Sequence, residues 1–187
     1  SGKLPKVVIP VHFAGQPCNM PAIHELSQRY GFKIVEDASH ALGASHNENK
    51  VGSCVHSDIT VFSFHPVKII TTGEGGMALT NDNELANKMR RLSTHGITRD
   101  KTLIQSRPAN EIWNYQQIQL GFNYRMNDIQ AALGLSQMQR LDQNVSLRNQ
   151  IAREYDSKFI DSKVTTQCQI SDVYSSFHLY PVCIKES

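Results

Sequence analysis

Two residues of this sequence form a chemically useful pair, because a lysine amine and an aspartate carboxylate each come directly after a short apolar run. Asp37 ends the run that begins at Lys33, and Lys68 follows the run from Asp58 to Phe62. Both runs are rich in β-branched or aromatic residues, which is typical of buried strands. Open α/β sheets bind ligands where such strands end. The sequence therefore predicts an amine and a carboxylate at the ends of two strands.

The segment around Lys68 favours a rigid turn. Pro66 prevents a simple continuation of strand or helix, and the pair Gly75 and Gly76 allows a sharp return into a second strand at residues 77–80. An amine that forms a Schiff base with an aldehyde, and a carboxylate that keeps a pyridine nitrogen protonated, are what pyridoxal phosphate chemistry requires. Most lysines are only solvated surface residues, however, and a glycine pair is more often only a turn.

Five motifs strengthen the functional interpretation, and they occur in the order EDASHALGA, SFHPVKIITTGEGG, HGITRD, GFNYRMNDIQAALG and FHLYP. Together they resemble the DegT/DnrJ/EryC1/StrS family of sugar aminotransferases, over about residues 5–184. Within the family, the residues of the motifs GFNYRMND and EDASHALG are most similar to those of the PseC type. That type aminates a UDP-linked 4-keto sugar on the way to pseudaminic acid. The resemblance implies an α/β fold of the aspartate aminotransferase-like type I class, with a mainly parallel sheet flanked by helices.

The resemblance also implies roles for single residues around the cofactor, pyridoxal 5'-phosphate. Lys68 would be the Schiff-base lysine, Asp37 the partner of the pyridine nitrogen, and His40 a neighbour of the ring. Ser63 would donate its hydroxyl to the cofactor phosphate. The alternatives are a turn or cap carboxylate for Asp37, a backbone-bonded strand-end hydroxyl for Ser63 and a structural histidine for His40.

A second set of residues matches family positions that reach substrate or a neighbouring subunit. Asn123 and Arg125 correspond to positions that cross a dimer interface, with Asn123 toward the cofactor and Arg125 toward the substrate. Arg125 would otherwise balance nearby Asp128 at the surface. His65 and His178 are further candidate substrate contacts that the sequence does not separate from packing residues.

The function that these features predict is transfer of an amino group from glutamate to a nucleotide-linked 4-keto-6-deoxy sugar, by a homodimer with sites at its interface. Glutamate as donor comes from the resemblance alone. The related dehydratases carry histidine at the position of Lys68, so the lysine argues against them. The alternative from another class is a catalytically incompetent fragment that acts only as a dimerising or sugar-binding module.

Composition narrows the remaining classes of function. The 187 residues contain 19 Lys and Arg against 17 Asp and Glu, and the formal net charge of +2 comes without a basic run. Nucleic acid is therefore a poor candidate partner. No stretch has the length of apolar sequence that a membrane span needs. The four cysteines form no CxxC pair and the histidines no HExxH motif, so we expect no metal site and a cytoplasmic protein.

The expected order of elements follows from local patterns. We expect strands at residues 6–12, 33–37, 58–62, 77–80, 164–166 and 177–182, and a helix from an Asn19 cap to Gly31. A second helix should begin with an Asn81 to Glu84 capping box, and an irregular segment should span residues 96–120. Asn127 should cap one long helix whose apolar stripe consists of Ile129, Leu133, Met138, Leu141, Val145, Ala152 and Tyr155.

The domain organisation is inferred from the resemblance. Family members are longer at both ends, so the chain looks like an internal fragment. Residues 1–145 would be part of the large cofactor-binding domain, without its N-terminal portion. Residues 146–187 would continue the long helix and begin a small α+β C-terminal domain.

Overall fold

The computed structural model describes residues 3–104 and 113–184. Its residues divide into two compact units. The first comprises the chain up to residue 81 and again from residue 128 onwards, and the second comprises residues 82–127. The domain boundary expected at residue 145 concerns the whole family domain and stays a prediction.

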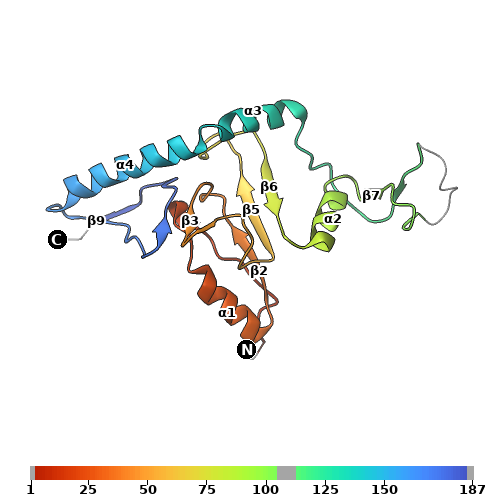
Figure 1. Ribbon diagram of the computed structural model, residues 1–187, viewed down its shortest axis with the longest axis horizontal. Helices are drawn as coiled ribbons and strands as arrows, with labels where there is room; N and C mark the ends of the chain where they lie inside the picture. The colour runs from red at the N-terminus through yellow and green to blue at the C-terminus, as the bar shows by residue number, and fades with distance from the viewer. Residues whose placement is uncertain (1–2, 105–112, 185–187) are drawn as a thin grey trace. The chain divides into compact units, whose positions relative to one another are not determined.

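A four-stranded sheet forms the centre of the first unit (Figure 1). Its strands, in spatial order, are β1 (Val7–Val8), β2 (Lys33–Asp37), β5 (Ile59–Ser63) and β6 (Gly76–Leu79). The pairs β1–β2 and β2–β5 are parallel, while β5–β6 is antiparallel. The prediction of a mainly parallel sheet is therefore confirmed, although the first strand is much shorter than residues 6–12.

Helix α1 (Met20–Tyr30) makes the crossover between β1 and β2, and its ends follow the predicted signals. The side chain of Asn19 accepts a hydrogen bond from the amide of Ala22, which satisfies one of the unpaired amides of the first turn. Gly31 closes the helix in the left-handed conformation, with φ of 74°. A residue without a Cβ adopts that conformation without a steric penalty.

The predicted single helix after Asn127 is two helices, α3 (Asp128–Met138) and α4 (Leu141–Phe159). Arg140 breaks the helical dihedral angles, with φ of −108° and ψ of 6°. The predicted stripe is buried only in part, since Val145 and Ala152 are buried while Ile129 is 84% exposed. Figure 1 shows α3 and α4 following one another along one side of the first unit.

Small sheets complete the first unit. The polar segment after residue 45 is a hairpin of β3 (Ser45–His46) and β4 (Asn49–Lys50), and β10 (Val173–Tyr174) pairs with β3. Strand β9 (Val164–Thr166) forms as predicted and pairs with β11 (Val182–Ile184). The prediction of a strand over residues 177–182 is wrong for most of its length, because Phe177 has φ of +42°, which ends extended structure.

The second unit contains α2 (Asn83–Leu92) and the strand pair β7 (Ile97–Thr98) and β8 (Gln116–Gln117). The cap of α2 is Asp82 rather than Asn81, since the Asp82 carboxylate accepts from the amides of Glu84 and Leu85. The two strands lie within the segment that we expected to be irregular. The part of that segment at residues 105–112 lies outside the described residues.

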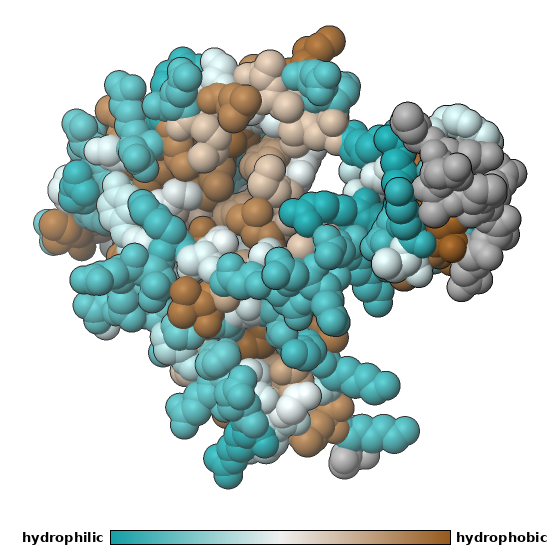
Figure 2. Space-filling view, turned by 45° about the vertical axis from the view of Figure 1, so that its right-hand side comes forward, coloured by the Kyte–Doolittle hydropathy of each residue, from teal (hydrophilic) through white to brown (hydrophobic). Residues whose placement is uncertain are grey.

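The buried apolar side chains of the first unit come mainly from the sheet, the segment after β5 and helix α4. The core includes Ile34, Phe62, Phe64, Ile69, Ile70 and Val145. A Cβ on Gly43 would lie only 2.8 Å from the Val145 side chain, so α4 packs closely on the loop after β2. Many large apolar residues remain exposed, and Figure 2 shows them in groups among hydrophilic ones.

Candidate active site

The carboxyl ends of β2 and β5 bring the predicted carboxylate and hydroxyl to one edge of the sheet. In the parallel register, Asp37 lies opposite Val61, and Ser63 follows two residues later at the end of β5. Parallel strands end at the same edge, so the loops that leave them share one region. The two strand ends therefore adjoin.

Lys68 lies in the loop that joins β5 to β6. Its amide donates to the carbonyl of His65, and the loop closes where the amide of Thr72 donates to the carbonyl of Phe64, at 3.0 Å. Ile69 and Ile70 directly after Lys68 are buried, with exposures of 6% and 2%. The half-buried Lys68 is therefore carried on a loop that is anchored in the core on one side and by backbone bonds on the other.

Asp37 stays ionised because of its surroundings. Burial raises the pKa of its carboxyl, but hydrogen bonds from Ser39 and the nearby charges of His40 and Lys68 outweigh burial and lower the pKa below its ordinary value. The Ser39 amide lies 3.1 Å from Oδ1. The strand end itself is fixed, since the Asp37 carbonyl accepts from the amide of His12 at 3.0 Å.

His40 and His178 form a ring pair beside Asp37, with centroids 4.5 Å apart and an angle of 46° between the ring planes. Nδ1 of His40 accepts a hydrogen bond from the amide of Ala14. Burial and the positive charge of Lys68 lower the pKa of His40, against the opposing effect of Asp37. Burial and the charges of His40, Lys68 and Arg148 lower the pKa of His178 to about 4. Both rings are therefore neutral at neutral pH.

The remaining predicted residues are placed differently. Ser63 accepts a long hydrogen bond of 3.4 Å from the amide of His65, and it is half-buried. His65 is exposed, and its Nε2 lies 3.8 Å from a carboxylate oxygen of Glu74. Asn123 and Arg125 are exposed residues of the second unit, and their approach to a site stays a prediction.

The sequence did not reveal that the turn at Phe13 and Ala14 would lie against His40. The Phe13 ring is 6.1 Å from the His40 ring, and the Ala14 amide binds that ring directly. This approach is set by the parallel pairing of β1 with β2, which continues into a bridge between Val11 and Asp37.

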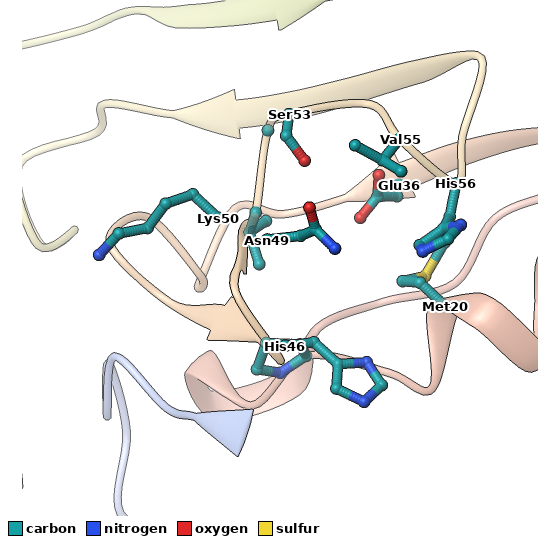
Figure 3. Close-up of a pocket in the computed structure, with 11 residues that line it drawn as sticks. Met20, Glu36, His46, Asn49, Lys50, Ser53, Val55 and His56 are labelled. Atoms are coloured by element: carbon teal, nitrogen blue, oxygen red, sulfur yellow. The ribbon is translucent and has the colours of Figure 1, made fainter. Parts of the chain in front are cut away.

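A small cavity of about 30 Å³ lies elsewhere, between the hairpin β3–β4 and the start of α1. Figure 3 shows Met20, Glu36 and His56 on one side of it, while the side chain of Lys50 extends away. Its volume suits about one water molecule. Neither Lys68 nor Asp37 lines it, so it is separate from the candidate site.

Residues 3–187 match the family model described as the DegT/DnrJ/EryC1/StrS aminotransferase family. The chain belongs to this family. It is 39% identical over 175 residues to the UDP-4-amino-4,6-dideoxy-N-acetyl-beta-L-altrosamine transaminase of Campylobacter jejuni, which covers 93% of the chain and 43% of that protein. It is 40% identical to the spore coat polysaccharide biosynthesis protein SpsC of Bacillus subtilis, over 97% of the chain and 46% of that protein.

Solved structures of the family agree with the fold. The aminotransferase PseC of Helicobacter pylori, involved in pseudaminic acid biosynthesis, has a TM-score of 0.85 at 33% identity, and the match covers 97% of the chain and 46% of that protein. The sugar aminotransferase Spr1654 of Streptococcus pneumoniae matches in its PLP form with a TM-score of 0.80 at 31% identity, over 96% of the chain and 48% of that protein. The chain thus spans less than half the length of these relatives.

Pyridoxal phosphate is the cofactor of this family, and solved relatives include both a PLP form and a PMP form. The side chains at the candidate site fit this group. Lys68 offers an amine, Asp37 a carboxylate that is held ionised, and Ser63 a hydroxyl at the strand end that faces the same region. No helix in the described part of the chain is long and apolar enough to cross a membrane.

Proposed function

We propose that this chain is the catalytic core of a pyridoxal-phosphate-dependent sugar aminotransferase, acting with glutamate on a nucleotide-linked 4-keto-6-deoxy sugar. The observation that carries the proposal is the position of Asp37 at the carboxyl end of two adjoining parallel strands, where the charge of Lys68 helps to lower the pKa of its carboxyl. The substrate class is supported by similarity to the Campylobacter transaminase, whose name specifies a UDP-linked 4-amino-4,6-dideoxy sugar. Its product would serve cell-surface polysaccharide or pseudaminic acid synthesis.

Each residue has a stated task in this proposal. Bound pyridoxal phosphate supplies an aldehyde that condenses with amines and a ring that accepts electrons. Nζ of Lys68 would be the point of covalent attachment and, once released, would carry a proton between substrate and cofactor carbons. The Asp37 carboxylate, which its lowered pKa keeps ionised, would hold a proton on the ring nitrogen. Ser63 would donate its hydroxyl to the phosphate, and His40 would lie beside the ring.

Covalent labelling tests the assignment of Lys68. Incubation with pyridoxal phosphate, reduction with borohydride and digestion should place the pyridoxyl mass on the peptide that contains Lys68. The variant Lys68→Met should lose this label, whereas Lys88→Met, on the exposed surface of α2, should keep it. The assignment would be ruled out if the label were found only on other lysines. It would also be ruled out if no label were found even in the complete protein, including any segments that flank this chain.

We further propose that Asn123 and Arg125 complete the site of a partner subunit, so that the active unit is a homodimer. Both are exposed in the second unit, and arginine suits phosphate or carboxylate groups because its planar guanidinium donates two parallel hydrogen bonds. Mixing complete proteins that carry Lys68→Ala and Arg125→Ala should restore part of the activity after subunit exchange, since one mixed site is then intact. Exchange without recovery would place Arg125 outside the partner's site.

A second candidate is a dimerising or sugar-binding module without turnover. Sugar nucleotide binding that persists in Lys68→Met, with no amino transfer by the unsubstituted complete protein, would support it. For either function we place the protein in the cytoplasm, since its four cysteines are all free thiols.

A further inference from the structure

The segment from Ser175 to Leu179 comes from the far end of the sequence and is tied to the candidate site by its backbone. The amide of Ser176 donates to the carbonyl of Gly15 at 3.0 Å, and the amide of Leu179 donates to the carbonyl of Ala14 at 3.2 Å. The Ser176 hydroxyl donates to the carbonyl of His40 at 2.8 Å. Ser176 is fully buried. These bonds hold the segment in the position where the ring of His178 packs against the ring of His40.

The approach is too close to tolerate a side chain at residue 15. A Cβ on Gly15 would lie 2.6 Å from Oγ of Ser176 and 2.8 Å from the amide nitrogen of Phe177. Phe177 itself has φ of +42°, a left-handed conformation that costs a bulky residue free energy. Such a backbone persists only where its surroundings hold it in place.

Helix α4 provides that support through two consecutive side chains. Nη1 of Arg148 donates to the carbonyl oxygens of Phe177 and His178, at 3.1 and 3.3 Å. The Asn149 amide donates to the carbonyl of Ser175 at 2.8 Å, and Asn149 is buried. Three carbonyls of the segment are therefore bound to one turn of α4, and the two that Arg148 binds belong to the strained Phe177 and to the residue after it.

The imidazole of His178 depends on this backbone support. Its Nδ1 is buried and has no hydrogen-bond partner within residues 3–104 and 113–184. The ring also lines a cavity of about 170 Å³, together with Arg148, Tyr155 and Tyr180, so space is open on one side of it. The position of the ring against His40 is thus set by the turn at Phe177.

We propose that Arg148 is a positioning residue of the candidate site, which holds the Phe177 turn and thereby keeps the His178 ring against His40. Arg148 acts on the histidine pair through two carbonyls rather than by contact with a ligand. The placement of the rings follows from this chain alone. Its consequence for catalysis rests on the proposed function, in which His40 lies beside the cofactor ring.

The test follows the ring signals of His40 and His178 by NMR, in histidine-labelled chain without cofactor. In Arg148→Met we expect the two ring environments to change, and the His178 titration midpoint to move from about 4 toward the ordinary 6.5 as the ring leaves its buried position. Arg148→Lys keeps both a donor and the charge, so it should restore much of the original spectrum. Arg153→Met, on an exposed position of the same helix, should leave both rings unchanged.

A second variant separates the hydrogen bonds from the charge. Arg148→Gln keeps a neutral donor, so under the proposal the ring signals stay closer to the original than in Arg148→Met, although the charge is lost in both. Equal changes in the two variants, with the ring contact intact, would overturn the proposal in favour of a purely electrostatic role. Unchanged rings in folded Arg148→Met would overturn it as well.

If Arg148→Met does not fold, the Gln and Lys variants decide by the same signals. In that case the proposal requires their rings to keep the contact between His40 and His178, and loss of the contact in Arg148→Lys would overturn it. Since the measurement needs neither cofactor nor turnover, failure of the Lys68 labelling experiment leaves its result independent.

Discussion

Glu36 and Asp37 are neighbours on β2, and because side chains alternate along a strand they point to opposite faces of the sheet. Glu36 is only 5% exposed and accepts hydrogen bonds from His12 at 2.7 Å, from Thr60 at 2.8 Å and from Ser57. Asp37 is half-buried, and its carboxylate accepts a bond from the amide of Ser39. One carboxylate is enclosed by partners, and the other is left accessible to a ligand.

The histidines on the two faces differ in the same way. Burial lowers the pKa of His12, but interactions with the Cys18 side chain, the hydrogen bond to Glu36 and the Glu36 charge outweigh burial and raise the pKa to about 9. Burial, together with the electrostatic effects of His40, Lys68 and Arg148, lowers the pKa of His178 to about 4. The two faces at the end of β2 therefore differ in role. Complete pairing on one side stabilises the fold, whereas incomplete pairing on the other keeps groups available for chemistry.

The largest effect on stability should come from breaking the pair on the Glu36 face. The variant Glu36→Met leaves His12 buried without its carboxylate, so we expect the free energy of unfolding to fall by about 3–5 kcal/mol. Urea unfolding followed by circular dichroism measures the change. The matched control is Lys33→Met on the same strand, which removes an exposed ion pair with Asp58 and should cost about 0–1 kcal/mol. Equal losses in the two variants would contradict the contrast.

A smaller effect is expected from pH. The folded pKa of His12 lies above its ordinary 6.5, so its contribution to stability is complete below pH 6.5 and is lost as pH rises through about 9. The folded pKa of Glu36 lies below its ordinary 4.5, mainly because the bonds from His12 and the two hydroxyls outweigh the effect of burial. Its contribution is complete above pH 4.5 and declines as pH falls below that value. The pair should therefore stabilise most between pH 4.5 and 6.5.

The difference in stability between the unsubstituted chain and His12→Gln, measured by urea unfolding across this range, isolates the pair from other titrating groups. We expect it to decline by on the order of 2 kcal/mol toward pH 9. The amide of Cys18, 3.1 Å from Nδ1 of His12, can donate only to an unprotonated nitrogen. A flat difference between pH 6 and 9 would therefore show that the ring stays neutral and keeps this bond.

The sequence predicted the elements whose signals are local. The cap at Asn19, the closing Gly31 and the apolar run of β2 each depend on residues within a few positions, and all three are confirmed. Two predictions failed, and for the second of them the deciding contact was not local. The break at Arg140 interrupts an otherwise continuous apolar period, and the Phe177 turn is held by Arg148, which lies far away in the sequence.

The candidate site was predictable to a similar degree. Asp37 and Ser63 were found because they end apolar runs, and the parallel register does bring these ends together. The hydrogen-bonded pair of Glu36 and His12 was not predicted, because the sequence around a glutamate in a strand does not indicate which histidine will contact it. His12 lies 24 residues away in sequence, and only the pairing of β1 with β2 brings the two into contact.

The smallest effect on stability, and the largest on chemistry, should come from Asp37→Asn. The amide oxygen of Asn can still accept from Ser39, and the side chain is already half-exposed, so we expect unfolding to change by less than about 1 kcal/mol. A neutral amide cannot hold a proton on the ring nitrogen, so amino transfer by the complete protein should fall by at least about 10²-fold.

Glu36→Gln makes the same chemical change on the opposite face of the strand. It should lower the free energy of unfolding more than Asp37→Asn does, because Glu36 is the buried partner of His12, yet leave the turnover of folded protein close to that of the unsubstituted enzyme. Urea unfolding and the turnover number are measured on both variants. Near-normal turnover in Asp37→Asn would remove Asp37 from the site. Equal loss of turnover in both variants would contradict the difference in role between the two faces, because that difference requires that only Asp37→Asn lowers turnover.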